Sequence, residues 1–211
     1  MRFAKIILLV FGALGVCAVA QQIPPPAPAP SKRIVLAAST VLDGKGRVLR
    51  DARIVVDGSK IAALDTKNDP KAAPADYDLR GLTVLPGWID AHVHINWSFG
   101  KDGKNMNAGE ASTDAAYQAA ANAWVTLLAG FTTVQSMGSP NDGPLRDAIA
   151  RGTLPGPRIL TAVEGLSGRG EQTGTPDEIR AFIRKQKAAG ADFIKIYASG
   201  GMRSGGLTMS Q

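Results

Sequence analysis

Two histidines, one residue apart and just after a proline-glycine turn, constrain this chain more than any other feature. The stretch runs from Leu85 through Pro86-Gly87 into a strand-like segment ending at Ile95, and it carries His92 and His94. Because side chains alternate between the faces of a strand, both imidazoles are predicted to project to one side. Two imidazoles held in this way can bind one metal ion. These are the chain's only 2 histidines, which argues against chance placement, although exposed strand histidines are the simpler alternative.

The composition is that of an ordinary globular chain, with 45% hydrophobic and 20% charged residues among 211. A net charge of +6 would indicate a nucleic-acid partner only if the basic residues clustered. Lysine and arginine are instead spread along the whole chain, without a basic run or interleaved aromatic residues. Nucleic-acid binding is therefore not expected.

Residues 1–20 are predicted to be a secretory signal. Two basic side chains precede an apolar run over residues 6–16, and Ala-Val-Ala at residues 18–20 favours cleavage before Gln21. The apolar run is short for a bilayer, so no stable membrane anchor is expected. Cleavage would also remove Cys17, the only cysteine, and leave a mature chain without disulfides. These features predict a periplasmic or secreted protein.

Residues 21–32 are proline-rich, which predicts an extended linker. Residues 33–82 then show the pattern of short β-strands separated by Asp-Gly turns, at Asp43-Gly44 and Asp57-Gly58. We therefore predict a small β-sheet portion before the main domain. Its clearest strands are residues 33–36, 52–56 and 59–64.

From residue 83 to residue 211 the pattern changes to strands that alternate with helices. Such alternation implies right-handed βαβ units and a parallel sheet, and hence an α/β fold. The helix starts carry capping residues and glycines follow the helix ends. Strands are predicted at residues 83–85, 131–134, 158–163 and 192–197, and helices at residues 115–128 (with capping residues at 112–114), 145–150 and 176–190.

The last predicted strand contains a lysine that the alternation turns toward the interior. Lys195 is predicted to share a face with Phe193 and Tyr197. An unpaired buried ammonium is costly, and burial favours the neutral amine. A neutral amine can form a Schiff base, or it can add CO₂ to become an anionic carbamate. A structural lysine paired with a carboxylate, or an exposed lysine at a sheet edge, is the alternative.

The stretch Trp88-Ile89-Asp90-Ala91-His92-Val93-His94 resembles the first barrel strand of the amidohydrolase superfamily. The segment over residues 192–201 is similar to the fourth barrel strand of its prolidase-like and imidazolonepropionase-like members. Between them, residues 129–140, 145–152 and 155–160 follow in the family's order. The resemblance covers about residues 34–211, and it implies the N-terminal half of a (β/α)₈ TIM barrel preceded by a small β-sandwich portion.

The resemblance also implies a metal site. His92, His94 and carboxylated Lys195 would hold two divalent metal ions, with zinc the expected metal and CO₂ the source of the carbamate. Because barrel sites lie at the C-terminal ends of the strands, the residues around those ends are pocket candidates. They are Asp90, Trp97, Arg169, Tyr197 and Ser199. Arg169 stands where several relatives carry a histidine, which leaves the substrate open.

The function implied by the resemblance is metal-assisted hydrolysis of an amide-type C–N bond, in a dipeptide or an N-acyl amino acid. A cyclic amidase of imidazolonepropionase type and a non-catalytic half-barrel binding module are the alternatives. A complete barrel takes about 250 residues. The chain is therefore expected to be part of a longer enzyme and inactive alone, with the aspartate proton shuttle beyond Gln211. No catalytic residue is identified in the chain itself, and a homo-oligomer stays open.

Overall fold

The computed structural model describes residues 32–66, 74–105, 112–167 and 174–198. The predicted secretory signal and nearly all of the predicted linker lie outside these residues. The chain forms two compact units, one from the described parts of residues 1–41 and 48–83 and the other from residues 42–47 and 84 onward. Within the described residues, no helix is long and apolar enough to cross a membrane.

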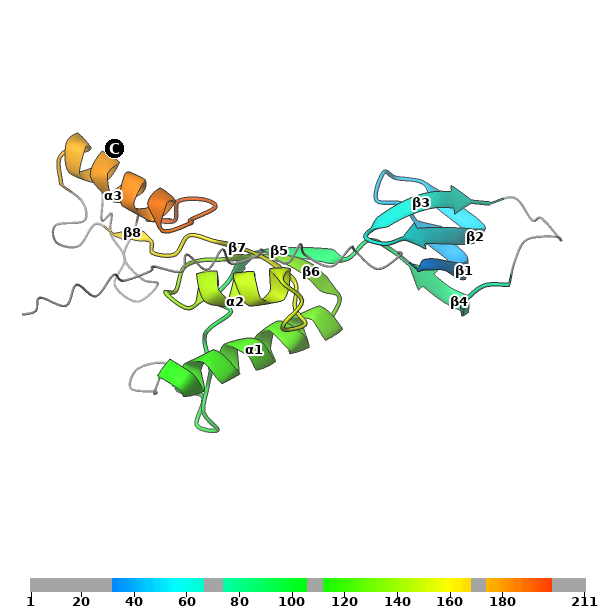
Figure 1. Cartoon of the computed structure of the whole chain (residues 1–211), viewed down its shortest axis with the longest axis horizontal. Helices are drawn as coiled ribbons and strands as arrows, with labels where there is room; N and C mark the ends of the chain where they lie inside the picture. Colours follow the sequence, from blue (N-terminus) through cyan, green and yellow to red (C-terminus); the bar gives the residue numbers. More distant parts are fainter. Residues whose placement is uncertain (1–31, 67–73, 106–111, 168–173, 199–211) are drawn as a thin grey trace, which may run out of the picture. The chain divides into compact units, whose positions relative to one another are not determined.

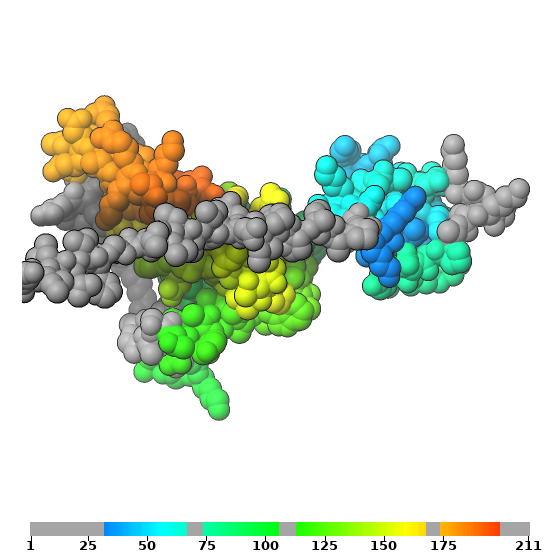
Figure 2. Space-filling model, in the orientation of Figure 1, coloured from blue at the N-terminus to red at the C-terminus, as the bar shows by residue number. Residues whose placement is uncertain are grey.

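The first unit contains a four-stranded sheet with the strand order β3-β2-β1-β4. A tight turn with Gly58 at a positive φ of 58° joins β2 to β3, and Asp57 pairs with Lys60 across it. The predicted hairpin at Asp57-Gly58 is therefore confirmed. The side chains of this sheet pack into one compact body (cyan in Figure 2). Its strands are β1 (Arg33–Leu42), β2 (Val48–Asp57), β3 (Lys60–Asp65) and β4 (Tyr77–Val84).

One predicted strand belongs to this sheet and not to the main domain's sheet. Thr83 and Val84, expected to lead into the histidine segment, end β4, which pairs with β1. The described residues form a single sheet here, and a second sheet that would complete a sandwich stays a prediction.

The second unit contains a three-stranded sheet with the order β5-β6-β7, and both strand pairs are parallel. The predicted parallel α/β arrangement is therefore confirmed for these strands. Because each strand is added beside the previous one, the connecting helices α1 and α2 lie side by side along the sheet (Figure 1). The strands are β5 (Trp88–Val93), β6 (Phe131–Ser136) and β7 (Arg158–Thr161), and the helices are α1 (Ser112–Leu128) and α2 (Asp142–Ala150).

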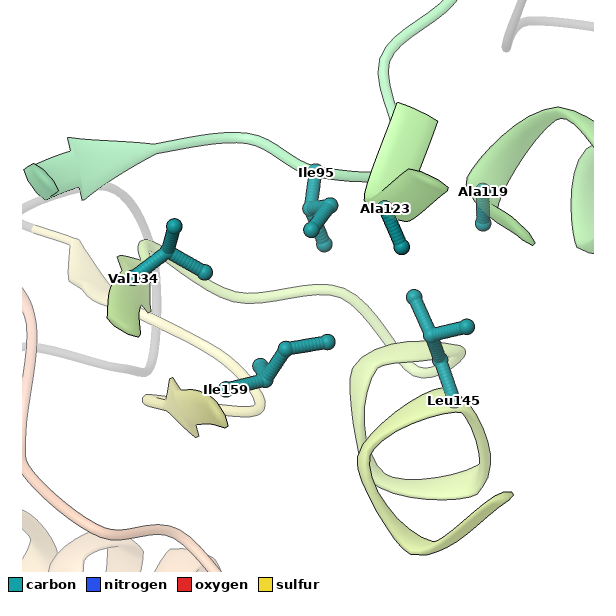
Figure 3. Packing of buried hydrophobic residues seen from close by; sticks show 6 residues of the cluster. All are labelled: Ile95, Ala119, Ala123, Val134, Leu145 and Ile159. Carbon is teal, nitrogen blue, oxygen red and sulfur yellow. The ribbon is translucent and has the colours of Figure 1, made fainter. Parts of the chain in front are cut away.

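A small apolar core holds the helices of this unit to its sheet (Figure 3). Ile159 of β7 and Val134 of β6 point toward α1 and α2, where Leu145 meets them. Ala119 and Ala123 of α1 are small enough to let that helix approach closely. The complete cluster is Ile95, Ala119, Ala123, Val134, Leu145 and Ile159.

The predicted strand over residues 192–197 is wrong for its first four residues. Only Ile196–Tyr197 (β9) is a strand, and it pairs in parallel with Leu166–Ser167 (β8). The physical reason is the Asp192 side chain, which accepts a hydrogen bond from the Thr161 N–H (2.9 Å). A side chain that satisfies the backbone in this way competes with a regular ladder.

The predicted strand over residues 158–163 likewise ends early, at Thr161. The Val163 N–H donates to the Thr161 hydroxyl (2.9 Å), and Val163 has a positive φ of 61°.

Helix α2 begins at Asp142, three residues before the predicted start, and Asn141 occupies its N-cap position.

The helix α3 (Pro176–Ala188) begins where the sequence predicts, with a capping box. The Thr175 hydroxyl accepts from the Glu178 N–H, and the Glu178 carboxylate accepts from the Thr175 N–H. This second bond lowers the pKa of Glu178.

Thr175→Ala is expected to lower the free energy of unfolding by about 1 kcal/mol, because one helix N–H loses its acceptor. Urea denaturation of the purified protein measures this loss. Thr175→Ser keeps the hydroxyl and should behave as wild type. Equal stability of the alanine and serine variants would contradict the capping role.

Candidate metal centre

The two histidines lie at the C-terminal end of β5. His92 is the second-last residue of the strand and His94 follows it directly. Their ring centroids are 5.8 Å apart with an interplanar angle of 58°, so both rings lie on the same side of the chain. Their nitrogens can therefore be turned toward a shared point, as ligation of one ion requires.

A tryptophan supports the second ring. The Trp97 indole stacks on His94 with centroids 4.0 Å apart and planes 14° apart. Asn122 of α1 holds the Trp97 segment, because its side-chain amide donates to the carbonyls of Ile95 (2.9 Å) and Trp97 (2.8 Å). An open cavity of about 290 Å³ lies beside this stack. It is lined by Val93, His94, Ile95, Trp97, Asn122, Val125 and Thr126.

The surroundings of His94 favour its neutral form. Burial of the ring is the largest cause that lowers the pKa of His94, and electrostatic interactions with His92 and Lys195 lower it further. The negative charge of Asp142 opposes them. A neutral imidazole is the form that binds metal, so protons compete weakly for this nitrogen.

Lys195 lies just before β9 and is half-buried. Its ammonium nitrogen lies 5.1 Å from the centroid of the Tyr197 ring. The positive charge of Lys195 also lowers the pKa of His94. Gly165 passes so close that a Cβ there would meet Tyr197 Cε2 at 2.4 Å and Lys195 Cγ at 3.1 Å. Among the described residues, no ion pair includes Lys195.

The remaining predicted pocket residues fall into two groups. The Asp90 carboxylate accepts a hydrogen bond from the His92 N–H (2.9 Å), so it is turned to its own backbone. Arg169 and Ser199 lie outside the described residues. Of the five pocket candidates, Trp97 contacts His94 and Tyr197 contacts Lys195.

One buried carboxylate near this centre escaped the sequence analysis. Asp142 has no exposed surface, and it accepts from the Thr161 hydroxyl (2.7 Å) and from the Asn96 amide. Ser136 and the backbone of Ser139 also hydrogen-bond to it. Burial is the main cause that raises the pKa of Asp142, against the lowering effect of these bonds. In the sequence, Asn-Asp-Gly before a helix predicts an exposed helix cap, whereas Asp142 is buried.

The donor set matches the expected metal site in part. Two imidazoles and a carbamate oxygen on Lys195 would supply three ligand atoms, and nitrogen and oxygen donors suit zinc. Across the parts of the chain that the structure describes, no group of three or more His, Cys, Asp or Glu side chains gathers to hold an ion. Further metal ligands would have to come from residues other than those that the structure describes.

The parallel β/α sheet carries the histidine pair at the C-terminal end of its first strand. The profile of the Amidohydrolase family matches residues 83–210, more than half of the chain. The chain belongs to the amidohydrolase family.

Individual relatives agree with this assignment. An imidazolonepropionase of Micrococcus luteus is 30% identical over 125 residues, which cover 56% of this chain and 29% of that protein. An ochratoxinase of Aspergillus niger is 26% identical over 214 residues, covering 82% and 44%. The solved structure of a Xaa-Pro dipeptidase with bound methionine has a TM-score of 0.69 and 30% identity, covering 81% and 48%. The chain therefore spans less than half the length of each of these relatives.

Proposed function

We propose that the protein containing this chain is a metal-dependent hydrolase of amide-type C–N bonds, acting on dipeptides or N-acyl amino acids. His92, His94 and a carboxylated Lys195 would hold two divalent ions, with zinc as the expected metal. The observation that carries the proposal is the pair of imidazole rings 5.8 Å apart at the C-terminal end of β5. Burial and the nearby charge of Lys195 lower the pKa of His94. Active sites of β/α barrels lie at this end of the strands.

The chain's own residues would prepare the site. Trp97 limits rotation of the His94 ring by stacking on it, and the Asn122 amide fixes the Trp97 backbone. Lys195 lies against the Tyr197 ring, and Gly165 passes close to both side chains. When bound, the metals would polarise the substrate carbonyl and lower the pKa of the attacking water.

Two substrate classes have separate support. Similarity to the Xaa-Pro dipeptidase structure extends over 81% of the chain, which favours a linear dipeptide or N-acyl amino acid. Identity to an imidazolonepropionase covers 56% of the chain, which favours a cyclic amide as the second candidate. The dipeptide class is preferred because its support covers more of the chain.

The test uses the full-length gene product, stripped of metal and titrated with Zn²⁺. Binding of about two ions per chain, with hydrolysis of Xaa-Pro dipeptides or N-acyl amino acids, is the expected result. Hydrolysis of imidazolonepropionate alone would shift the assignment to the cyclic amidase. Absence of both metal binding and hydrolysis would favour a non-catalytic binding module.

Lys195→Met is expected to lower the metal content and to reduce kcat/KM by about 10³-fold, since loss of a metal site removes several kcal/mol of transition-state stabilisation. Metal analysis and hydrolysis rates measure the two effects. Lys185→Met, at an exposed lysine of α3, is the matched control and should change neither. A wild-type Lys195 trapped by borohydride in the presence of substrate would instead indicate a Schiff base.

A further inference from the structure

The buried carboxylate of Asp142 connects the ends of all three strands of the parallel sheet. Asn96 comes shortly after β5, Ser136 is the last residue of β6, and Thr161 is the last residue of β7. All three side chains hydrogen-bond to this one carboxylate, which has no exposed surface. The bonds therefore join neighbouring strands at the end where the proposed site lies.

On one side, this network holds the segment that follows His94. Asn96 bonds directly to Asp142, and the neighbouring Ile95 N–H approaches the Ser136 hydroxyl at 3.5 Å. Asn96 is two residues from His94 and is itself followed by Trp97, which stacks on His94. A shift of Asn96 would therefore move both the His94 ring and the side chain that supports it.

On the other side, the network reaches the segment that precedes Lys195. The Thr161 N–H donates to the Asp192 carboxylate (2.9 Å), and the Asp192 N–H donates to the Thr161 carbonyl (2.8 Å). Arg146, on the same helix as Asp142, donates to the Asp192 carboxylate (3.1 Å) and to the Gly190 carbonyl (2.8 Å). Helix α2 thus holds the histidine side through Asp142 and the lysine side through Arg146.

A simple helix cap does not account for Asp142. The residue before it, Asn141, occupies the N-cap position and makes no side-chain cap bond. The Asp142 side chain instead accepts from groups at the strand ends. Burial of a carboxylate is costly, and the raised pKa of Asp142 reflects this cost. Well-packed apolar residues would hold a helix to a sheet without that cost.

We propose that Asp142 is a positioning residue that sets the separation between the histidine pair and Lys195. The inference rests on the proposed function, because it assumes that these three side chains bind metal together. Asp142 would touch neither metal nor substrate. It would act through Asn96 on the histidine side and through Thr161 and Asp192 on the lysine side. Partners of this kind orient ligands, and their removal costs about 10–100-fold in metal affinity.

The experiment measures Zn²⁺ affinity, the visible spectrum of the Co²⁺-loaded protein and the urea midpoint for the full-length protein and its variants. Asp142→Asn is expected to weaken Zn²⁺ binding by about 10–100-fold and to change the Co²⁺ spectrum. Asp114→Asn replaces an exposed aspartate in the first turn of α1 and is the matched control, with no change expected.

A milder pair of variants keeps the test decisive if Asp142→Asn does not fold. Thr161→Val removes the hydroxyl that donates to Asp142 at nearly constant volume, whereas Thr161→Ser keeps it. Zn²⁺ affinity should fall in the valine variant and be restored in the serine variant.

The outcomes separate the two proposals. A wild-type protein that binds no metal contradicts the proposed function and this inference with it. Wild-type metal binding that stays unchanged in the folded Asp142→Asn and Thr161→Val proteins overturns this inference alone, even if their urea midpoints fall, because Asp142 would then stabilise the fold without positioning the ligands.

Discussion

His94→Asn is expected to lower kcat/KM of the full-length protein by at least about 10³-fold, because loss of a metal ligand removes several kcal/mol of transition-state stabilisation. The centroid of the His94 imidazole lies 5.8 Å from that of the His92 ring, and burial is the main cause that lowers the pKa of His94. Asparagine fills similar space but offers no imidazole nitrogen. Metal content and hydrolysis rates, measured on the same preparation, test this expectation.

The control for this substitution is Trp97→Phe. Phenylalanine keeps an aromatic ring on His94 and is expected to retain the metal, with a smaller loss of activity. His92→Asn should resemble His94→Asn, because the two rings are proposed to share one ion. A His94→Asn protein with full metal content and full activity would disprove the metal role of the pair.

Ile159→Ala is expected to lower the free energy of unfolding by about 2–5 kcal/mol, because it deletes buried methyl and methylene groups and leaves a cavity. Ile159 is only 2% exposed and lies in the cluster that joins β6 and β7 to the two helices (Figure 3). Urea denaturation followed by circular dichroism measures the loss.

Ile61→Ala is the matched control for the core substitution, because Ile61 is 68% exposed on β3. It is expected to change stability by less than about 0.5 kcal/mol. Equal losses in the two variants would show that the described cluster is not the core of the second unit.

Elements defined by local interactions were predicted well from the sequence. Helix α1 ends at Leu128 as predicted, before the positive-φ Gly130, although it begins at Ser112, among the predicted capping residues. Helix α3 begins after the Thr175 cap, and the turn at Gly58 joins β2 to β3. Each of these features depends on residues within a few positions of one another, so the pattern along the chain contains the information.

Elements that depend on distant partners were predicted less well. Residues 192–195 alternate between polar and apolar side chains only in part and were predicted as the start of a strand, yet the Thr161 N–H donates to the Asp192 carboxylate, 31 residues later. Thr83 and Val84 belong to the N-terminal sheet because β4 pairs with β1. In both cases a long-range hydrogen-bond partner, and not the local pattern, decided the outcome.

By itself, the sequence determined the ends of α1 and α2, the start of α3, the turn at Gly58 and the placement of two histidines at successive same-face positions, since all of these follow from backbone geometry over a few residues. Only the tertiary structure decided that Asp142 is buried and that one carboxylate collects hydrogen bonds from three strand ends. The reason is physical: the burial of a polar group is set by the residues that close over it, and here these come from β5, β6 and β7, which meet only when the sheet has formed.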